Sequence, residues 1–280
     1  DTTNAINQYK FDRAGKDAIF AFKERVLVHF AVDLTNVYMT TKLEGAHTYF
    51  LPFNQGSNGA GKVGGKGNPV NPDGYDTAYL WERVLCKDSL MEILQKYMHL
   101  QQEYDKNGNL VKETMIFPRY HQLDVVTKLL EDVKKNGSGK SYLIQHSAGS
   151  GKSNSIAWLA HQLVGLKADN GKEIFDTVIV VTDRINLDKQ IKNTIKQFTQ
   201  VSSTVGWAKS AGELKDLLDN GVKIIITIVH KFQFILEDIS DVYKNNNFAI
   251  LIDEAHSSQN GSLSAKMNIV LSGNVSEDED

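Results

Sequence analysis

Two stretches decide the fold. Residues 146–153 read His-Ser-Ala-Gly-Ser-Gly-Lys-Ser, and residues 250–256 read Ile-Leu-Ile-Asp-Glu-Ala-His. A glycine-rich loop between a strand and a helix can wrap a phosphate group with its backbone N–H groups. A carboxylate at the carboxyl end of a buried parallel strand is placed to face such a loop. Because each stretch follows an apolar run, the pair predicts the two halves of one nucleotide site.

The chain around these stretches alternates between strand and helix patterns. Wholly apolar strands are typical of a parallel sheet that is covered on both faces. The pattern therefore predicts an α/β fold with a RecA-like, doubly wound parallel sheet. We expect strands at Ser141–Gln145, Thr177–Thr182, Lys223–Ile228 and Ala249–Ile252, and helices at His121–Lys134, Lys152–Leu166 and Leu187–Phe198.

The part before residue 119 has a different pattern. Runs rich in Val, Tyr, Phe and Thr predict a meander of short strands, and a glycine- and proline-rich stretch predicts a long irregular loop. A helix with Asp88 or Ser89 as its cap comes next, followed by a polar segment with an Asn107-Gly108 turn. We predict a domain boundary there, giving domains 1–105 and 106–280. The strands are expected at Val26–Ala31, Asn36–Thr41 and His47–Leu51, the loop at Asn54–Gly74, the helix at Asp88–Leu100 and the polar segment at Gln101–Lys112.

Composition bounds the class of protein. The 280 residues carry a net charge of −3, which disfavours a polycation that coats nucleic acid but allows a local basic track. A single cysteine, Cys86, excludes an internal disulfide and a cysteine-based zinc site. It fits the reducing cytoplasm. Because no run of 18 apolar residues occurs, we expect no membrane span. The chain starts at Asp1 without an initiator Met, so we expect a fragment.

The glycine loop supplies the phosphate ligands of the predicted site. Lys152 would reach the β- and γ-phosphates of ATP, and the Ser153 hydroxyl would bind Mg2+. Gly149 and Gly151 allow backbone conformations that a side chain would block. Ser147 and Ser150 complete the loop. The full phosphate-loop rule asks for glycine where His146 stands, so a glycine-rich turn of some other α/β protein is the alternative interpretation.

The second stretch supplies the acidic groups. Asp253 would hold Mg2+, and Glu254 would orient or deprotonate the attacking water. His256 would link the site to the rest of a motor. The alternative interpretation is an ordinary acidic turn. Gln122, in Arg119-Tyr120-His121-Gln122, can donate to and accept from the edge of adenine, which would select ATP. A solvated glutamine at a helix start is the alternative there.

Two further strand ends are candidate DNA contacts. Thr182 and Arg184 follow one strand, and Thr227 and Lys231 lie at and after another. Hydroxyls, backbone amides and helix N-termini at strand ends can hold phosphate oxygens without reading bases. Ordinary strand-end loops explain the same residues equally well.

Taken together, these residues closely resemble the restriction subunit of type I restriction-modification enzymes. The stretches that carry the resemblance are Ala5–Lys10, Arg25–Thr41, Phe50–Asn54, Arg119–Gln122, Gln145–Leu163, Val180–Gln190 and Ile250–Gln259. The resemblance implies a subunit that pumps double-stranded DNA with ATP and cuts unmodified DNA away from the recognition site. It also implies modification and specificity subunits as partners. On this map residues 1–105 are the C-terminal part of a restriction-endonuclease-like α/β domain, and residues 106–280 are the first of two motor domains.

The resemblance also implies parts that this chain lacks. The nuclease Asp and Glu-x-Lys of the family precede the segment that holds Gln8 and Tyr9, and these two residues either support the nuclease site or simply pack a helix. The second motor domain and its arginine finger would follow. We therefore expect these 280 residues alone to bind ATP without efficient hydrolysis or DNA cleavage. The rival hypotheses are a type III restriction subunit or remodeller-like translocase, an unrelated P-loop ATPase or small kinase, and a non-enzymatic ATP-gated scaffold.

Overall fold

The computed structural model describes residues 1–13, 17–147, 149–182, 194–195, 205–232 and 246–253. The chain divides into two compact units, residues 1–125 and 126–280. Helix α3 (Tyr120–Asn136) begins in the first unit and continues into the second. The predicted boundary after residue 105 stays a prediction. No helix among the described residues is both long and apolar enough to cross a bilayer.

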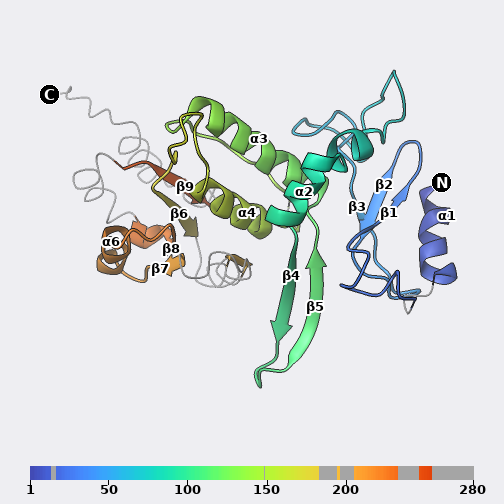
Figure 1. The fold of residues 1–280 in the computed structure, drawn as a ribbon, viewed down its shortest axis with the longest axis horizontal. Coiled ribbons are helices and arrows are strands. Elements are labelled where there is room, and N and C mark those ends of the chain that lie inside the picture. Colours follow the sequence, from blue (N-terminus) through green and yellow to red (C-terminus); the bar gives the residue numbers. More distant parts are fainter. Residues whose placement is uncertain (14–16, 148, 183–193, 196–204, 233–245, 254–280) are drawn as a thin grey trace. The chain divides into compact units, whose positions relative to one another are not determined.

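The first unit is built on a small antiparallel sheet with strand order β1-β2-β3, which confirms a meander (Figure 1). The third predicted strand, His47–Leu51, is wrong except at Leu51, where β3 begins. The N-terminal helix α1 continues into the short π-helix η1 and packs on β1. Between β3 and the π-helix η2 runs the predicted irregular loop. The elements are α1 (Thr2–Asn7), η1 (Gln8–Asp12), β1 (His29–Val32), β2 (Val37–Thr40), β3 (Leu51–Pro52), η2 (Leu80–Val84) and α2 (Lys87–Lys96).

Two predictions about the segment after η2 need correction. Helix α2 starts at Lys87 with Cys86 as its N-cap, so neither Asp88 nor Ser89 caps it. The predicted helix Asp88–Leu100 also extends too far, because α2 ends at Lys96 and β4 (His99–Tyr104) then pairs antiparallel with β5 (Leu110–Ile116) in a β-hairpin. The Asn107-Gly108 turn is confirmed at its tip, where the Asp105 carboxylate accepts the backbone N–H groups of Asn107 and Asn109, both at 2.8 Å. A turn thus closed by side-chain bonds lets two polar strands pair.

Aromatic rings form the core of the first unit and hold the start of α3. The Phe53 ring lies edge-on to Phe30 at 5.5 Å and to Tyr120 at 5.9 Å between centroids. Phe117 packs against both phenylalanines. The Tyr79 hydroxyl donates to the Phe53 carbonyl oxygen at 2.9 Å. Offset and edge-to-face rings of this kind stabilise beyond the area they bury.

Truncation of this core should destabilise the first unit. Phe53 is fully buried, so Phe53→Ala removes a ring and leaves a cavity, which should lower the free energy of unfolding by about 3–5 kcal/mol. Denaturant unfolding would measure this. The control is Tyr49→Ala, because the Tyr49 side chain is 75% exposed. Similar losses from the two substitutions would contradict the assignment of Phe53 to the core.

The turn between β1 and β2 is closed by the Asp33 carboxylate. It accepts hydrogen bonds from the backbone N–H groups of Thr2 at 3.0 Å, Thr35 at 2.9 Å and Asn36 at 2.8 Å. Partial burial acts to raise the pKa of Asp33. The hydrogen bonds from Thr35, Thr2 and Asn36 outweigh that effect and lower the pKa to about 2.

This pKa predicts an acid-sensitive contribution to stability. A carboxyl with a depressed folded-state pKa stabilises the fold above its unfolded value of 3.8 and loses that contribution as pH falls toward about 2. Asp33→Asn should reduce stability at pH 7, because an amide N–H would face the Thr2 N–H. It should also flatten the fall of stability between pH 3.8 and about 2, because an amide does not ionise there. Urea titrations from pH 7 downward would measure both. An equal effect from Asp73→Asn, at an exposed turn, would contradict this role.

The second unit contains a four-stranded parallel sheet of order β7-β8-β6-β9, which confirms the predicted α/β class and parallel strands (Figure 1). Strand β6 is buried at every residue, as a central strand covered on both faces must be. The predicted helix 187–198 lies outside the described residues except for residues 194–195. The elements are α4 (Lys152–Val164), β6 (Thr177–Thr182), β7 (Val205–Trp207), α6 (Ala211–Asp219), β8 (Ile224–Ile228), α7 (Val229–Phe232) and β9 (Phe248–Ile252).

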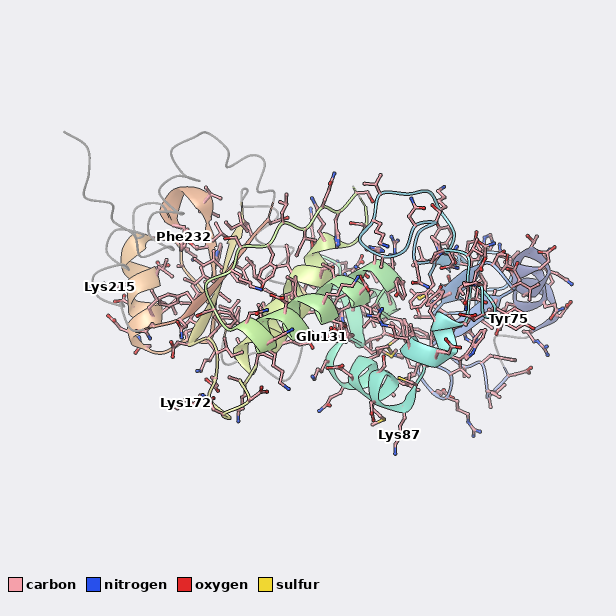
Figure 2. The ribbon with its side chains drawn as sticks, turned by 90° about the horizontal axis from the view of Figure 1, so that it is seen from above. Tyr75, Lys87, Glu131, Lys172, Lys215 and Phe232 are labelled. Carbon is pink, nitrogen blue, oxygen red and sulfur yellow. The ribbon has the colours of Figure 1, made fainter. Side chains whose placement is uncertain are left out.

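Helices cover the sheet of the second unit. Successive strand residues point to opposite faces. Ile179, Val181 and Ile225 face α6 and α7 and form one cluster with Leu214 and Phe232, the latter labelled in Figure 2. The alternate residues are equally buried. Helix α4, with Trp158 fully buried, packs against β6, β8 and β9.

The predicted strand Ser141–Gln145 is absent from this sheet. Residues 137–147 have neither helix nor strand, and Leu143 is 89% exposed. The Tyr142 hydroxyl donates to the Asp132 carboxylate of α3 at 2.6 Å, and Lys140 forms an ion pair with the same carboxylate at 3.1 Å. These side-chain bonds hold the segment along α3. Apolar composition alone could not reveal this competing partner.

Candidate nucleotide-binding site

The order of the parallel strands creates a switch point between β6 and β9. After β6 the chain adds β7 and β8 on one side, and it then places β9 on the other side of β6. Open parallel sheets bind ligands outside the carboxyl ends of the strands where the order reverses in this way. The residues at those ends are Thr182 and Asp253, so this edge is the candidate site.

Register brings three of the predicted site residues to this edge. Val181 is paired with Ile252 on one side and with Thr227 on the other. The Asp253 backbone N–H extends the ladder by donating to the Val181 carbonyl oxygen at 2.9 Å. Thr182 and Asp253 are therefore neighbours at the ends of adjacent strands. Asp253 is only 7% exposed, and burying a carboxylate is costly unless it is paired or binds a metal.

The two threonines differ in how their hydroxyls are satisfied. The Thr227 hydroxyl donates to the Ala208 carbonyl oxygen at 3.4 Å. The Thr182 hydroxyl oxygen is buried and has no hydrogen-bond partner among the described residues. A buried polar atom without a partner calls for an explanation, and a water or an ion is one. The Thr182 hydroxyl and the Asp253 carboxylate, at the ends of adjacent strands, are hard oxygen ligands of the kind that suits Mg2+ or a phosphate-bound water.

The glycine loop has the backbone geometry that phosphate wrapping requires. Gly149 has φ +72° and Gly151 has φ +84°, in the left-handed region that favours glycine. The Ser150 N–H closes a turn onto the Ser147 carbonyl oxygen at 3.2 Å. Helix α4 then begins at Lys152, and Gly151, its N-cap, has no side chain to cap it. The positive dipole end of α4 thus lies next to the loop, where it favours an anion.

Gln122 lies in the first unit, in the first turn of α3. Its side-chain oxygen accepts the Arg119 backbone N–H at 2.9 Å, which caps the helix. The residue is buried, so the solvated-glutamine interpretation is wrong. Contact with adenine stays a prediction. An amide oxygen has a second lone pair, so the cap does not exhaust its capacity to accept.

Sequence reasoning missed the residues that fix this turn. The Arg83 guanidinium donates to the Tyr120 hydroxyl at 3.3 Å and lies 3.5 Å from the buried Asp124 carboxylate. Burial raises the pKa of the Tyr120 hydroxyl, and the positive charge of Arg83 opposes that shift. Arg83 and Tyr120 are separated by 37 positions. No local pattern connects them, so only the fold reveals the contact.

Gln8 and Tyr9 lie at the start of η1. The Tyr9 ring packs against His29 at 5.4 Å and Phe50 at 5.7 Å, and its hydroxyl donates to the Phe30 carbonyl oxygen at 3.4 Å. Gln8 is exposed. The contacts of Tyr9 are those of a helix packed on its sheet; support of a nuclease site stays a prediction.

Several predicted residues lie outside the described residues. They are Arg184 in the candidate DNA track and Glu254 and His256 beyond β9. Lys231 belongs to α7, but its side chain is outside the described part of the chain. Their roles stay predictions.

Comparison with known proteins identifies the family. The profile of the SWI2/SNF2 ATPase family matches residues 121–276, more than half of the chain. The match includes the glycine loop, the parallel sheet and Asp253. The chain therefore belongs to the SWI2/SNF2 ATPase family.

Curated relatives confirm the more particular resemblance, to restriction subunits of type I enzymes. A putative type I restriction enzyme MjaIXP endonuclease subunit of Methanocaldococcus jannaschii is 30% identical over 212 residues, 72% of this chain and 18% of the relative. The type I restriction enzyme HindI endonuclease subunit of Haemophilus influenzae is 27% identical over 165 residues, 57% of this chain and 15% of the relative. A Staphylococcus saprophyticus subunit, SsaAORF53P, is 26% identical over 65% of this chain and 18% of its own length.

The chain thus spans less than a fifth of the length of these relatives. The alignment with the Methanocaldococcus subunit spans 212 residues, which is longer than the whole stretch from residue 121 to residue 280. The similarity to restriction subunits therefore extends into the first unit, before the family match begins.

Proposed function

We propose that this chain is the ATP-binding part of a type I restriction subunit, whose complete protein moves double-stranded DNA at the expense of ATP and cuts unmodified DNA away from its recognition site. The supporting observation is the edge at which Thr182 and Asp253 meet, in the same unit as a glycine loop that opens α4. Family membership supports ATP use, and the names of the relatives support restriction.

In the proposed site each group has one task. Lys152 and the N–H groups of the loop bind the phosphates and orient the terminal one. Ser153 and Asp253 would hold Mg2+, which supplies charge neutralisation on the phosphate oxygens when bound. Glu254 positions a water and accepts its proton. Gln122 contacts adenine. The sheet is RecA-like in this proposal, with residues 106–280 as the first motor domain and residues 1–105 as part of a nuclease domain.

The DNA and the partner subunits are proposed from the same reasoning. Thr182 and Thr227 lie at the carboxyl ends of β6 and β8, and Arg184 and Lys231 come after these ends in the sequence. Contacts to backbone phosphates there would allow movement along any sequence. The choice of DNA site would belong to the specificity subunit, and the protection of self DNA to the modification subunit. We place this activity in the cytoplasm.

Loss of the loop lysine should abolish tight nucleotide binding. Lys152→Ala removes a charge-assisted contact to phosphate, worth about 1.5–3 kcal/mol, so ATP affinity should fall roughly 10- to 150-fold. A fluorescent ATP analogue titrated into the protein measures this. Lys172→Ala, at an exposed lysine labelled in Figure 2, is the control. Equal affinities of the Lys152→Ala variant and the control would contradict the proposed phosphate loop.

Glu254→Gln separates binding from turnover. The amide keeps the shape of the side chain but cannot accept a proton, so ATP binding should persist while ATP hydrolysis by the complete protein falls by about 10²- to 10⁴-fold. Glu131→Gln, at an exposed position of α3, is the matched control. Undiminished turnover in Glu254→Gln would remove Glu254 from the mechanism. A simultaneous loss of binding would instead indicate a structural role.

The family match also favours a second candidate, a SWI2/SNF2-type duplex translocase without nuclease activity. The two candidates share the ATP site and differ in DNA cleavage. ATP-dependent cutting of unmodified duplex by the complete protein with its partner subunits supports restriction. Translocation without cutting under the same conditions supports the alternative.

A further inference from the structure

The loop Gly56–Gly67 of the first unit is an ordered structure rather than a loose tether. Gly56 and Gly67 close its base, with the Gly56 N–H donating to the Gly67 carbonyl oxygen at 2.8 Å. One step further in, the Ser57 N–H donates to the Gly65 carbonyl oxygen at 3.0 Å, and the Gly65 N–H donates back to the Ser57 hydroxyl at 2.8 Å. The Asn58 side-chain amide reaches the Val63 carbonyl oxygen at 2.7 Å.

Hydrogen bonds of asparagine side chains attach this loop to the β1–β3 sheet. The Asn54 side-chain oxygen accepts the Val37 N–H at 2.8 Å and the Asn68 amide at 3.0 Å. Asn68 also donates to the Thr35 carbonyl oxygen and accepts the Gln55 N–H, both at 2.8 Å. The loop base therefore shares hydrogen bonds with the β1–β2 turn and β2. A tip held in this way loses little freedom when it binds a ligand.

The exposed tip carries only positive charge. The sequence contains no Asp or Glu from Gly45 through Pro72, while Lys62 and Lys66 stand at the tip. Both lysines are exposed. Even Val63 between them is 98% exposed, so burial of apolar surface does not explain the order of the tip.

The backbone of the tip turns tightly and leaves some of its N–H groups without a hydrogen bond inside the described part of the chain. Gly59 and Gly61 have φ +88° and +75°, and Ala60 between them has a negative φ. The Lys62 N–H donates to the Gly59 carbonyl oxygen at 3.3 Å, which closes this tight turn. The N–H groups of Gly61, Val63 and Lys66 donate no hydrogen bond within the described residues. A Cβ at Gly59 or Gly61 would meet no atom of the protein. The space at these glycines is open to a ligand.

We propose that the tip of this loop binds a phosphate of the duplex DNA backbone, with the Lys62 and Lys66 side chains as cationic donors and the N–H groups of Gly61, Val63 and Lys66 beside them. The residues of the loop indicate that it binds an anion. That this anion is a DNA phosphate rests on the proposed function. Such a contact would position the DNA without reading its sequence. It adds a DNA contact in the first unit to the strand ends of the second.

The test is the salt dependence of DNA binding by the complete protein without nucleotide. Each lost phosphate contact should lower the slope of log K against log[salt] by about 0.9, so Lys62→Gln with Lys66→Gln should lower it by about 1.8. At 0.1 M salt this corresponds to an affinity up to about 60-fold weaker. Fluorescence anisotropy with a labelled duplex that lacks the recognition site measures both.

The matched control is Lys106→Gln with Lys112→Gln, which removes the same charge from exposed positions of the β4–β5 hairpin. A second variant, Gly61→Ala, keeps both lysines but strains the turn, because Gly61 has φ +75°; it should weaken binding with little change of slope. Thermal unfolding checks that each variant is folded. Equal slopes for the loop variant and the control would overturn the proposal.

Measurements of ATP affinity and of DNA-stimulated ATP turnover distinguish a failure of this proposal from a failure of the proposed function. ATP affinity should be unchanged in the loop variant; a selective loss of ATP affinity would assign the loop to nucleotide phosphate and overturn the DNA contact. If DNA still stimulates ATP turnover while the loop variant and the control have equal salt slopes, only the loop contact is overturned and the proposed function stands. Absence of DNA binding by the unmodified protein would overturn both.

Discussion

The pairing of β6 between β8 and β9 is the constraint on which the second unit depends. Strand β6 is buried along its whole length, and the residues between Thr177 and Thr182 are all apolar. Thr182 and Asp253 are polar because they stand where the strands leave the core. The switch of strand order between β6 and β9 then opens this edge to a ligand. The same packing that stabilises the sheet thus determines where chemistry can occur.

Glycine has two different uses in this chain. In the loop before α4, positive φ at Gly149 and Gly151 leads the backbone into a helix whose dipole favours an anion at its N-terminus. In the loop Gly56–Gly67, positive φ shapes a tip that no helix supports, and asparagine side chains supply the rigidity instead. The loop Gly56–Gly67 is thus held by side-chain bonds, whereas the loop before α4 continues directly into a helix.

The sequence predicted most of what depends on local pattern. Strand β6 matches its predicted bounds, and β8, β9, α3 and α4 begin or end within a few residues of theirs, because apolar periodicity reports burial directly. The Ser141–Gln145 strand was wrong because Asp132, on α3, binds Tyr142 and Lys140. The hairpin β4–β5 and the contact of Arg83 with Tyr120 were missed because their partners are distant in sequence or polar. The site residues could be predicted because they belong to sequence motifs, whereas their neighbours in space could be identified only from the fold.

The measurement that tests the central claim most directly is ATP hydrolysis by the complete protein, assembled with its modification and specificity partners. Unmethylated duplex target, methylated duplex target, single-stranded DNA and RNA would be compared at equal concentration. Our account predicts turnover stimulated by the unmethylated duplex and not by the other three. Equal stimulation by single strands or RNA, or no stimulation by any nucleic acid, would contradict a duplex DNA motor even though the α/β fold remained.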